Sequence, residues 1–85
     1  MANYRVVVAS SAIKELRTFP KKDRQRLSSR LESLGVDPRP AGYEKLAGQN
    51  RHRVRQGDYR IIDAIDDAAR TVDVVKIGHR KEVYR

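Results

Sequence analysis

The chain has 85 residues, enough for one domain around one hydrophobic core, and 39% hydrophobic against 35% charged residues predict a thin core. The absence of cysteine excludes disulfides and thiolate metal sites and fits a reducing compartment. No stretch approaches the roughly 20 apolar residues of a membrane span, and the first residues lack a signal-peptide pattern. We therefore expect a single domain over residues 1–85, cytoplasmic and without membrane contact.

The chain is strongly basic, with 19 Lys and Arg against 11 Asp and Glu and a net charge of +8. Such an excess favours nucleic acid or an acidic protein as partner. Arg supplies 13 of the 19 positive charges. Because Arg stays protonated and binds phosphate through two hydrogen bonds, this bias favours phosphate or carboxylate recognition.

The first element predicted is a strand over residues 4–8, from its β-branched content. Ser10 and Ser11 then offer an N-cap for a first helix, which should end near residues 18–19, ahead of Pro20.

Pro20 can open a second helix, whose apolar stripe is Leu27, Leu31 and Leu34, with Gly35 as its expected C-terminal cap. The two helices should form a hairpin that lays one apolar face on a sheet. The other faces of the second helix are basic. We predict a solvated surface there, with a secondary RNA contact as the alternative.

After a loop over residues 37–42, residues 51–60 are typical of a β-hairpin. Gly57 and Asp58 suit a two-residue loop, which pairs Gln56 with Tyr59 and Arg55 with Arg60. Side chains alternate along a strand, so four arginines should share one sheet face: Arg51, Arg53, Arg55 and Arg60. Like charges repel, by about 1 kcal/mol at 4 Å in water, so such a face is either solvated or built for an anion. His52 falls with Val54 on the opposite, core side.

The remaining chain predicts a strand over residues 59–65, a turn over 66–69, a strand over 71–77, a break at 78–81 and a short edge strand at 82–85. The fold class is therefore α+β: an N-terminal strand, a two-helix hairpin, then an antiparallel meander of three to four strands with the helices on one face. Four carboxylates are expected in or beside a turn, as surface groups: Asp63, Asp66, Asp67 and Asp73.

Several kinds of site are excluded by the sequence. His52 and His79 have no further ligand at metal spacing, no glycine-rich phosphate loop is present, and no Ser stands in a nucleophile elbow. We expect neither a metal nor a cofactor.

Three runs of residues carry a family resemblance: Lys-Leu-Ala-Gly at 45–48, Arg-Val-Arg-Gln-Gly-Asp-Tyr-Arg-Ile-Ile at 53–62, and Val-Lys-Ile-Gly-His-Arg-Lys-Glu-Val-Tyr at 75–84. Together they resemble the RelE branch of the RelE/ParE toxin superfamily over nearly the whole chain. The Arg-rich strand and its turn are shared with the ParE branch, whereas the last run is typical of RelE.

The resemblance implies a toxin of a type II toxin–antitoxin system that cuts mRNA in the ribosomal A site. In that reaction the ribose 2′-hydroxyl attacks the adjacent phosphate, giving a 2′,3′-cyclic phosphate and a free 5′-hydroxyl. The implied partners are the ribosome, mRNA and a RelB-like antitoxin, whose docking by helix or by strand addition stays open. Because the chain ends one residue after Tyr84, we expect no regulatory C-terminal helix.

The resemblance also implies roles for individual residues. Arg60 matches the phosphate-stabilising arginine, Arg80 the arginine that protonates or stabilises the leaving group, and Tyr84 the tyrosine that stacks on a base. Arg51 and Arg53 fall where the best-known members have two lysines. Since Arg effectively cannot lose its proton, these two are better interpreted as electrostatic, and Arg55 as a contact to backbone phosphate.

The general base is left open by the residues. Histidine in general has a pKa of about 6.5, and His79 stands beside Arg80, so His79 is a candidate base or acid. Tyr84 is the other candidate, because nearby arginines would lower its ordinary pKa of about 10. Alternatively Arg60 and Arg80 serve only in salt bridges, to Asp58 or Glu82.

Two other functions compete with the nuclease. One is a ParE-like toxin that binds DNA gyrase and is not an enzyme; it would not need Arg80 and Tyr84. The other is a non-catalytic RNA-binding module, which would tolerate Arg80→Lys.

Overall fold

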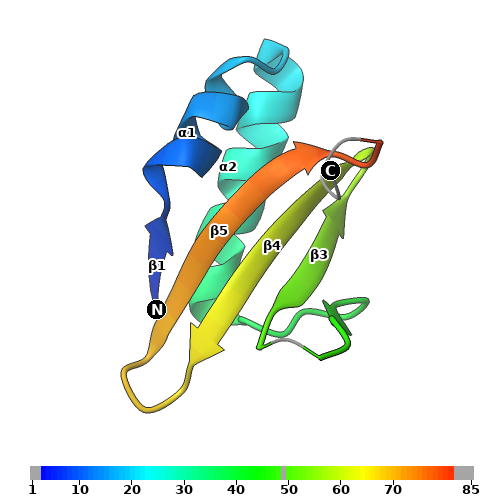
Figure 1. Cartoon of the computed structure of the whole chain (residues 1–85). Helices are drawn as coiled ribbons and strands as arrows, with labels where there is room; N and C mark the ends of the chain where they lie inside the picture. Colours follow the sequence, from blue (N-terminus) through cyan, green and yellow to red (C-terminus); the bar gives the residue numbers. More distant parts are fainter. Residues whose placement is uncertain (1–2, 49, 82–85) are drawn as a thin grey trace.

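The part of the chain that the structure describes forms a five-stranded sheet with two helices on one face (Figure 1). The structure is a computed structural model, and it describes residues 3–48 and 50–81. In chain order the elements are β1 (Arg5–Val8), α1 (Ser10–Arg17), α2 (Lys21–Val36), β2 (Glu44–Lys45), β3 (His52–Gln56), β4 (Tyr59–Asp66) and β5 (Thr71–His79).

The strands lie in the order β1-β5-β4-β3-β2. The antiparallel meander is confirmed, because β2, β3, β4 and β5 pair with their neighbours in opposite directions. The N-terminal strand β1 instead pairs in parallel with β5, from Arg5 opposite Thr71 to Val8 opposite Val74. This parallel pair is possible because α1 and α2 carry the chain back across the sheet before the meander begins. The predicted α+β class, with both helices on one face, is confirmed.

The start of α1 differs from the prediction. Ser10 is already the first helical residue, and Ala9 occupies the N-cap without a side-chain hydrogen bond. Pro20 stands at the N-cap of α2, where its missing N–H costs nothing and its carbonyl accepts a hydrogen bond from the N–H of Arg24 at 2.9 Å.

Gly35 does not cap α2, as the sequence had suggested, but lies buried inside its last turn. Its carbonyl accepts hydrogen bonds from the N–H groups of Asn3 and Tyr4, at 2.8 and 2.9 Å. The end of α2 is therefore tied to the segment that leads into β1.

The core lies between the helices and the sheet. The predicted stripe of Leu27, Leu31 and Leu34 is buried, and Leu27 and Leu34 are fully so. These leucines form one cluster with residues from the inner face of the sheet, which are Val54, Ile61, Ile65, Val72, Val74 and Ile77. Within residues 3–48 and 50–81 no helix is long and apolar enough to cross a membrane.

Strand β5 runs further than predicted. The sequence indicated a break at residues 78–81, but the ladder with β4 continues, with Gly78 opposite Arg60 and His79 opposite Tyr59. Lys76 pairs with Ile62 and Val74 with Asp63, so Val75 is an extra residue in β5. The edge strand predicted at 82–85 lies outside the described residues.

Candidate functional site

The arginine hairpin forms as the sequence predicts. Gly57 and Asp58 join β3 to β4, with Gly57 at φ +58°, a left-handed conformation that Gly adopts readily. Arg55 lies opposite Arg60 and Gln56 opposite Tyr59. His52 and Val54 are buried toward the helices, so the side chains of Arg53, Arg55 and Arg60 lie on the other side of the sheet. We call this surface the arginine face.

Arg51 precedes β3 and is half-buried, and its expected place on the arginine face stays a prediction. Its carbonyl accepts the N–H of Leu46 at 2.9 Å, which closes the connection between β2 and β3.

The side chain of Arg60 is held against the turn of its own hairpin. Its Nη1 donates to the carbonyls of Gly57 and Tyr59, at 3.0 and 2.9 Å. Among the described residues, its other guanidinium nitrogens have no partner. The arrangement therefore fixes a cation in place while leaving donors for an anion.

Arg80 reaches the same turn from the end of β5. Its N–H donates to the carbonyl of Asp58 at 2.7 Å, and its Nε lies 3.8 Å from the Asp58 carboxylate. Both side chains are more than half exposed, so this ion pair is weak. Arg60 and Arg80 therefore both contact the same turn. The alternative partner of Arg80, Glu82, lies outside the described residues, as does Tyr84.

Glu44 is a charged neighbour of the arginine face that the sequence analysis missed. The two-residue strand β2 places it directly opposite Arg53. Its carboxylate forms an ion pair with Arg53 through Oε2 and with Arg55 through Oε1, the latter at 3.2 Å. A strand of two residues rich in neither β-branched nor aromatic side chains gives no pattern that sequence analysis could detect.

His79 faces the opposite side of the sheet from Arg60. It lies opposite Tyr59, with ring centroids 5.7 Å apart in an edge-to-face contact, and the Tyr59 hydroxyl donates to Asp23 of α2 at 3.0 Å. The N–H of Lys81 donates to Nδ1 of His79 at 3.3 Å. A neutral His79 therefore carries its proton on Nε2.

A pocket of about 210 Å³ opens beside His79, between the start of α2 and the hairpin turn. Its wall includes Gly57 and Asp58, so it ends at the same turn that Arg60 and Arg80 contact. His79 is thus separated from the arginine face by the sheet but connected to it around the turn.

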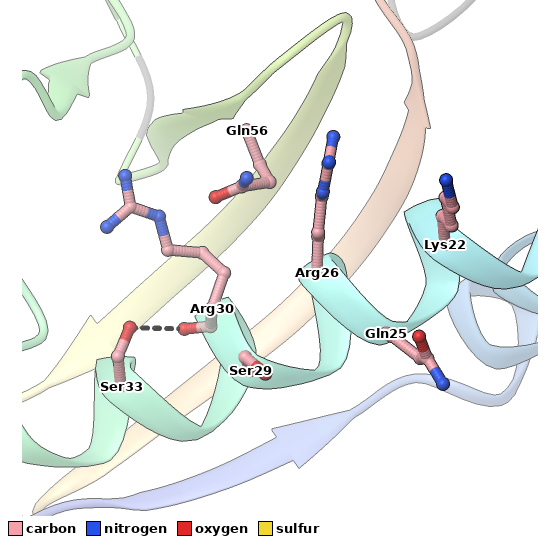
Figure 2. Close-up of a pocket in the computed structure, with 7 residues that line it drawn as sticks. All are labelled: Lys22, Gln25, Arg26, Ser29, Arg30, Ser33 and Gln56. Carbon is pink, nitrogen blue, oxygen red and sulfur yellow. Dashed lines mark hydrogen bonds between the residues drawn. The ribbon is translucent and has the colours of Figure 1, made fainter.

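A larger groove of about 630 Å³ runs between α2 and β3 (Figure 2). Figure 2 shows Lys22, Arg26 and Arg30 extending from the same side of α2. Nη2 of Arg30 donates to the carbonyl of Arg55 at 3.4 Å, so the groove adjoins the outer edge of the arginine hairpin. Lys22 and Arg26 are exposed, as expected for the basic surface of this helix.

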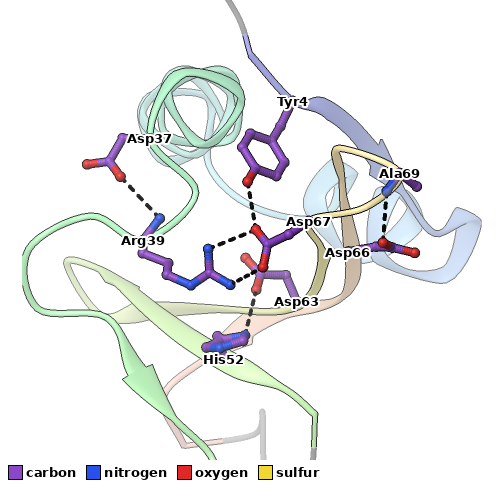
Figure 3. Close-up of polar contacts among 8 residues, drawn as sticks. All are labelled: Tyr4, Asp37, Arg39, His52, Asp63, Asp66, Asp67 and Ala69. Atoms are coloured by element: carbon purple, nitrogen blue, oxygen red, sulfur yellow. Dashed lines mark hydrogen bonds and ion pairs between the residues drawn. The ribbon is translucent and has the colours of Figure 1, made fainter.

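A polar cluster ties together the β4–β5 turn, the loop after α2 and the segment before β1 (Figure 3). Arg39 donates to both oxygens of Asp67, at 3.1 and 2.9 Å, and the Tyr4 hydroxyl donates to the same carboxylate at 2.6 Å. The hydrogen bonds from Arg39 and then Tyr4 lower the pKa of Asp67 to about 2. The cluster holds loops together at the end of the sheet opposite the hairpin turn.

The prediction that Asp63 is a surface carboxylate beside a turn is wrong. It lies within β4 on the helix side, fully buried, and burial raises its pKa to about 7. Neither of its oxygens has a hydrogen-bond partner among the described residues. Nδ1 of His52, which is also buried, lies 3.8 Å from Asp63 Oδ1, and burial lowers the pKa of His52. His52 is on the core side, as predicted.

The described residues contain no group of three His, Cys, Asp or Glu side chains that could hold a metal ion. What the site offers is cations: two arginines at a turn, and two more on the adjoining strand with a shared carboxylate. Such an arrangement can bind phosphate and stabilise negative charge.

Comparison with known proteins identifies the family. A family model described as the ParE toxin of the type II toxin–antitoxin system parDE matches residues 6–84. The chain belongs to this ParE toxin family. A curated relative, Toxin RelE of Mycobacterium tuberculosis, is 27% identical over 88 residues, covering 96% of this chain and 87% of its own.

Two solved structures extend the comparison to the fold. RelE in the archaeal RelE–RelB complex of Pyrococcus horikoshii has a TM-score of 0.84 and 27% identity, covering 94% of this chain and 98% of its own. A free double mutant of RelE from E. coli has a TM-score of 0.77 and 27% identity, covering 99% and 92%. These relatives confirm the resemblance to the RelE branch of the superfamily.

Proposed function

We propose that this ParE-family toxin is an endoribonuclease of the RelE type, which cuts mRNA in the ribosomal A site. The observation that carries the proposal is the arrangement at the hairpin turn: Arg60 held by two carbonyls, with Arg80 at the same turn. The RelE relatives favour this function over others on the same fold.

The proposed reaction is attack of a ribose 2′-hydroxyl on the adjacent phosphate. The bond from phosphorus to the 5′-oxygen of the next nucleotide breaks, leaving a 2′,3′-cyclic phosphate and a 5′-hydroxyl. Negative charge gathers on the phosphate oxygens in the transition state. Arg60 is the proposed donor to these oxygens, because its two carbonyl contacts hold it in place before the substrate arrives. Loss of one such donor typically costs about 10²–10³ in rate.

The other proposed roles follow from position. Arg80 is more than half exposed at the turn and would stabilise or protonate the departing 5′-oxygen. Arg53 and Arg55, with Arg51 nearby, would bind the neighbouring backbone phosphates. Tyr84 would stack on a base and orient the ribose.

Two groups remain candidates for moving the proton of the 2′-hydroxyl. His79 can act only on RNA that reaches around the hairpin turn into the adjacent pocket, and its Nδ1 already accepts a hydrogen bond from Lys81. Tyr84 is the second candidate. A site without a strong base depends on the ribosome to align the reacting atoms, so free RNA should be cut poorly.

The proposed partners are the ribosome, its bound mRNA and a RelB-like antitoxin, which places the toxin in the cytoplasm. The RelE relative from Pyrococcus horikoshii was solved in complex with RelB. A net charge of +8 favours an antitoxin segment that brings acidic side chains.

The test is primer extension on a reporter mRNA in a translation extract, comparing the wild type with Arg60→Ala and Tyr84→Ala. We expect cuts within codons that require ribosomes and fall at least about 100-fold in Arg60→Ala. The control is Arg17→Ala, which removes an exposed arginine at the end of α1 and should leave cutting unchanged. Intact mRNA in cells whose growth is arrested by the wild type would refute the proposal.

The second candidate function is inhibition of DNA gyrase by binding, which is favoured by the match to the ParE family model. A supercoiling assay with purified toxin distinguishes the two. Gyrase inhibition that persists in Arg60→Ala, together with intact mRNA, would establish this alternative.

A further inference from the structure

One carboxylate bridges two of the arginines on the proposed RNA-binding face. Oε2 of Glu44 forms its ion pair with Arg53, and Oε1 forms the second with Arg55 at 3.2 Å. Arg53 and Arg55 are alternate residues of β3, so their side chains lie side by side on one face. The carboxylate between them relieves the repulsion that the sequence alone predicts for this surface.

The position of Glu44 is set by the backbone. Strand β2 pairs Glu44 with Arg53 and Lys45 with His52, and the N–H of Leu46 donates to the carbonyl of Arg51 at 2.9 Å. The turn between β2 and β3 includes Gly48 at φ +71°. Glu44 is therefore presented to the two arginines by a hairpin, and not by chance contact of long side chains.

The two ion pairs differ in access to solvent. The side chain of Arg53 is 20% exposed, whereas Arg55 is 59% and Glu44 45% exposed. Exposed ion pairs are weak and exchange readily with other ions. The contact between Glu44 and Arg55 can therefore open first to an incoming phosphate, while Arg53 holds the carboxylate near.

Arg60 differs from these two arginines. Its partners among the described residues are the neutral carbonyls of Gly57 and Tyr59, so its charge is not cancelled. A phosphate can approach Arg60 directly, but a phosphate at Arg53 or Arg55 must compete with the carboxylate of Glu44.

We propose that Glu44 is a specificity-determining residue, an internal counter-ion that lowers the affinity of Arg53 and Arg55 for RNA phosphates. This inference rests on the proposed function for its biological meaning. Free single-stranded RNA, which must displace Glu44 without contacts outside the arginine face, binds weakly. RNA held by a larger partner, such as the ribosome, offsets the displacement through its other contacts. Glu44 thereby restricts the site to RNA that is presented to it.

The test measures binding of a short, fluorescently labelled 2′-O-methyl RNA, which cannot be cut because it lacks the attacking hydroxyl. Glu44→Gln keeps the size of the side chain and removes its charge. We expect about tenfold tighter binding at low salt, the scale of one exposed and one partly buried ion pair. The dependence of log Kd on log salt should steepen by up to about 1.4, since each phosphate bound to a single strand contributes about 0.7.

The matched control is Glu32→Gln, which removes one negative charge from an exposed position on α2. An equal effect of Glu32→Gln would show that only net charge matters and would overturn the proposal. The effect of Glu44→Gln should also vanish in a background of Arg53→Ala and Arg55→Ala, and its survival there would contradict the bridge.

Failure of this inference can be distinguished from failure of the proposed function. If Glu44→Gln tightens binding and steepens the salt dependence but mRNA on ribosomes is not cut, the counter-ion role of Glu44 is supported and the proposed nuclease function is refuted. If mRNA is cut on ribosomes but Glu44→Gln changes neither the RNA affinity nor its salt dependence, the counter-ion role is refuted and the nuclease function is supported. Because binding and its salt dependence are measured on folded protein, a purely structural role of Glu44 would leave the salt dependence unchanged.

Discussion

The buried carboxyl of Asp63 predicts a dependence of stability on pH that a single substitution should remove. Burial raises the pKa of Asp63 from 3.8 to about 7. At about 1.4 kcal/mol per pH unit, ionising this group inside the fold costs up to about 4 kcal/mol. Typical domains are stable by about 5–15 kcal/mol in total, so the cost is a large share.

The direction in which stability changes with pH follows from where the folded and unfolded chains bind the proton. Well below pH 3.8 Asp63 is protonated in both the folded and the unfolded chain, so it costs nothing. As pH rises from 3.8 to about 7, the unfolded chain releases this proton first, and stability falls across that window. His52 acts in the opposite direction: burial lowers its pKa from 6.5, so its contribution is present above pH 6.5 and is lost as pH falls through the folded pKa.

Asp63→Asn keeps the shape and removes the ionisation. The variant should match the wild type within about 1 kcal/mol near pH 4 and exceed it by up to about 4 kcal/mol near pH 8. Urea denaturation of both proteins across this range measures the difference. Asp73→Asn is the control, because it makes the same chemical change at an exposed carboxyl in β5.

The competing possibility is an internal ion pair, with the proton on His52 and Asp63 charged. Then Asp63→Asn would leave His52 as an uncompensated buried charge and would destabilise the protein, most near neutral pH. The geometry argues against the ion pair. The distance of 3.8 Å from His52 Nδ1 to Asp63 Oδ1 is too long for a hydrogen bond, and burying two charges without hydrogen bonds costs several kcal/mol per ion. A destabilised Asp63→Asn near pH 7 would refute the reasoning.

Two further predictions concern the core and the site. Leu34→Ala, at a fully buried position, should lower the free energy of unfolding by about 2–5 kcal/mol in urea denaturation. Val36→Ala, at an exposed helix end, should change it little. Equal losses in the two variants would contradict the assignment of Leu34 to the core. Arg80→Lys should reduce ribosome-dependent cutting at least about tenfold, because a lysine cannot reproduce the planar, two-pronged guanidinium contact to phosphate; full activity would favour a simple RNA-binding role.

The elements set by local patterns could be predicted from the sequence. Gly57 at a two-residue loop fixes the hairpin register, which places Arg55 opposite Arg60. The spacing of Leu27, Leu31 and Leu34 likewise indicates the buried side of α2. In both cases residues close in sequence decide the outcome.

The features that depend on distant partners could not be predicted in the same way. The pairing of β1 with β5 joins residues more than 60 positions apart, and a short apolar strand does not specify its neighbour. Strand β2, and with it Glu44, exists because β3 offers an edge. The extra residue Val75 shifts alternation in β5, so that Ile77 and His79 both face the helices.

The wrong prediction for Asp63 has a different cause, because the sequence does contain a pattern that indicates its burial. Tyr59, Ile61, Asp63 and Ile65 alternate along β4, and that period places Asp63 on the core side with the isoleucines. The prediction of a surface position relied on the charge of the carboxyl group and not on this alternation of side chains. A carboxyl at an inward position of a strand is better interpreted as a neutral, buried group, since burial without a partner favours its protonated form.

The two faces of the hairpin therefore differ in the charge state of their carboxyl groups. As a result, the carboxyl that affects stability and the carboxyl that affects the candidate site lie on different faces. On the helix side, Asp63 has no partner and avoids the cost of burial by staying protonated up to about pH 7. On the arginine face, solvent reaches Glu44 and Arg55, so their charges persist and their pairing can be exchanged for a phosphate. Substitutions at Asp63 should consequently change stability with little effect on RNA affinity, and substitutions at Glu44 should do the reverse.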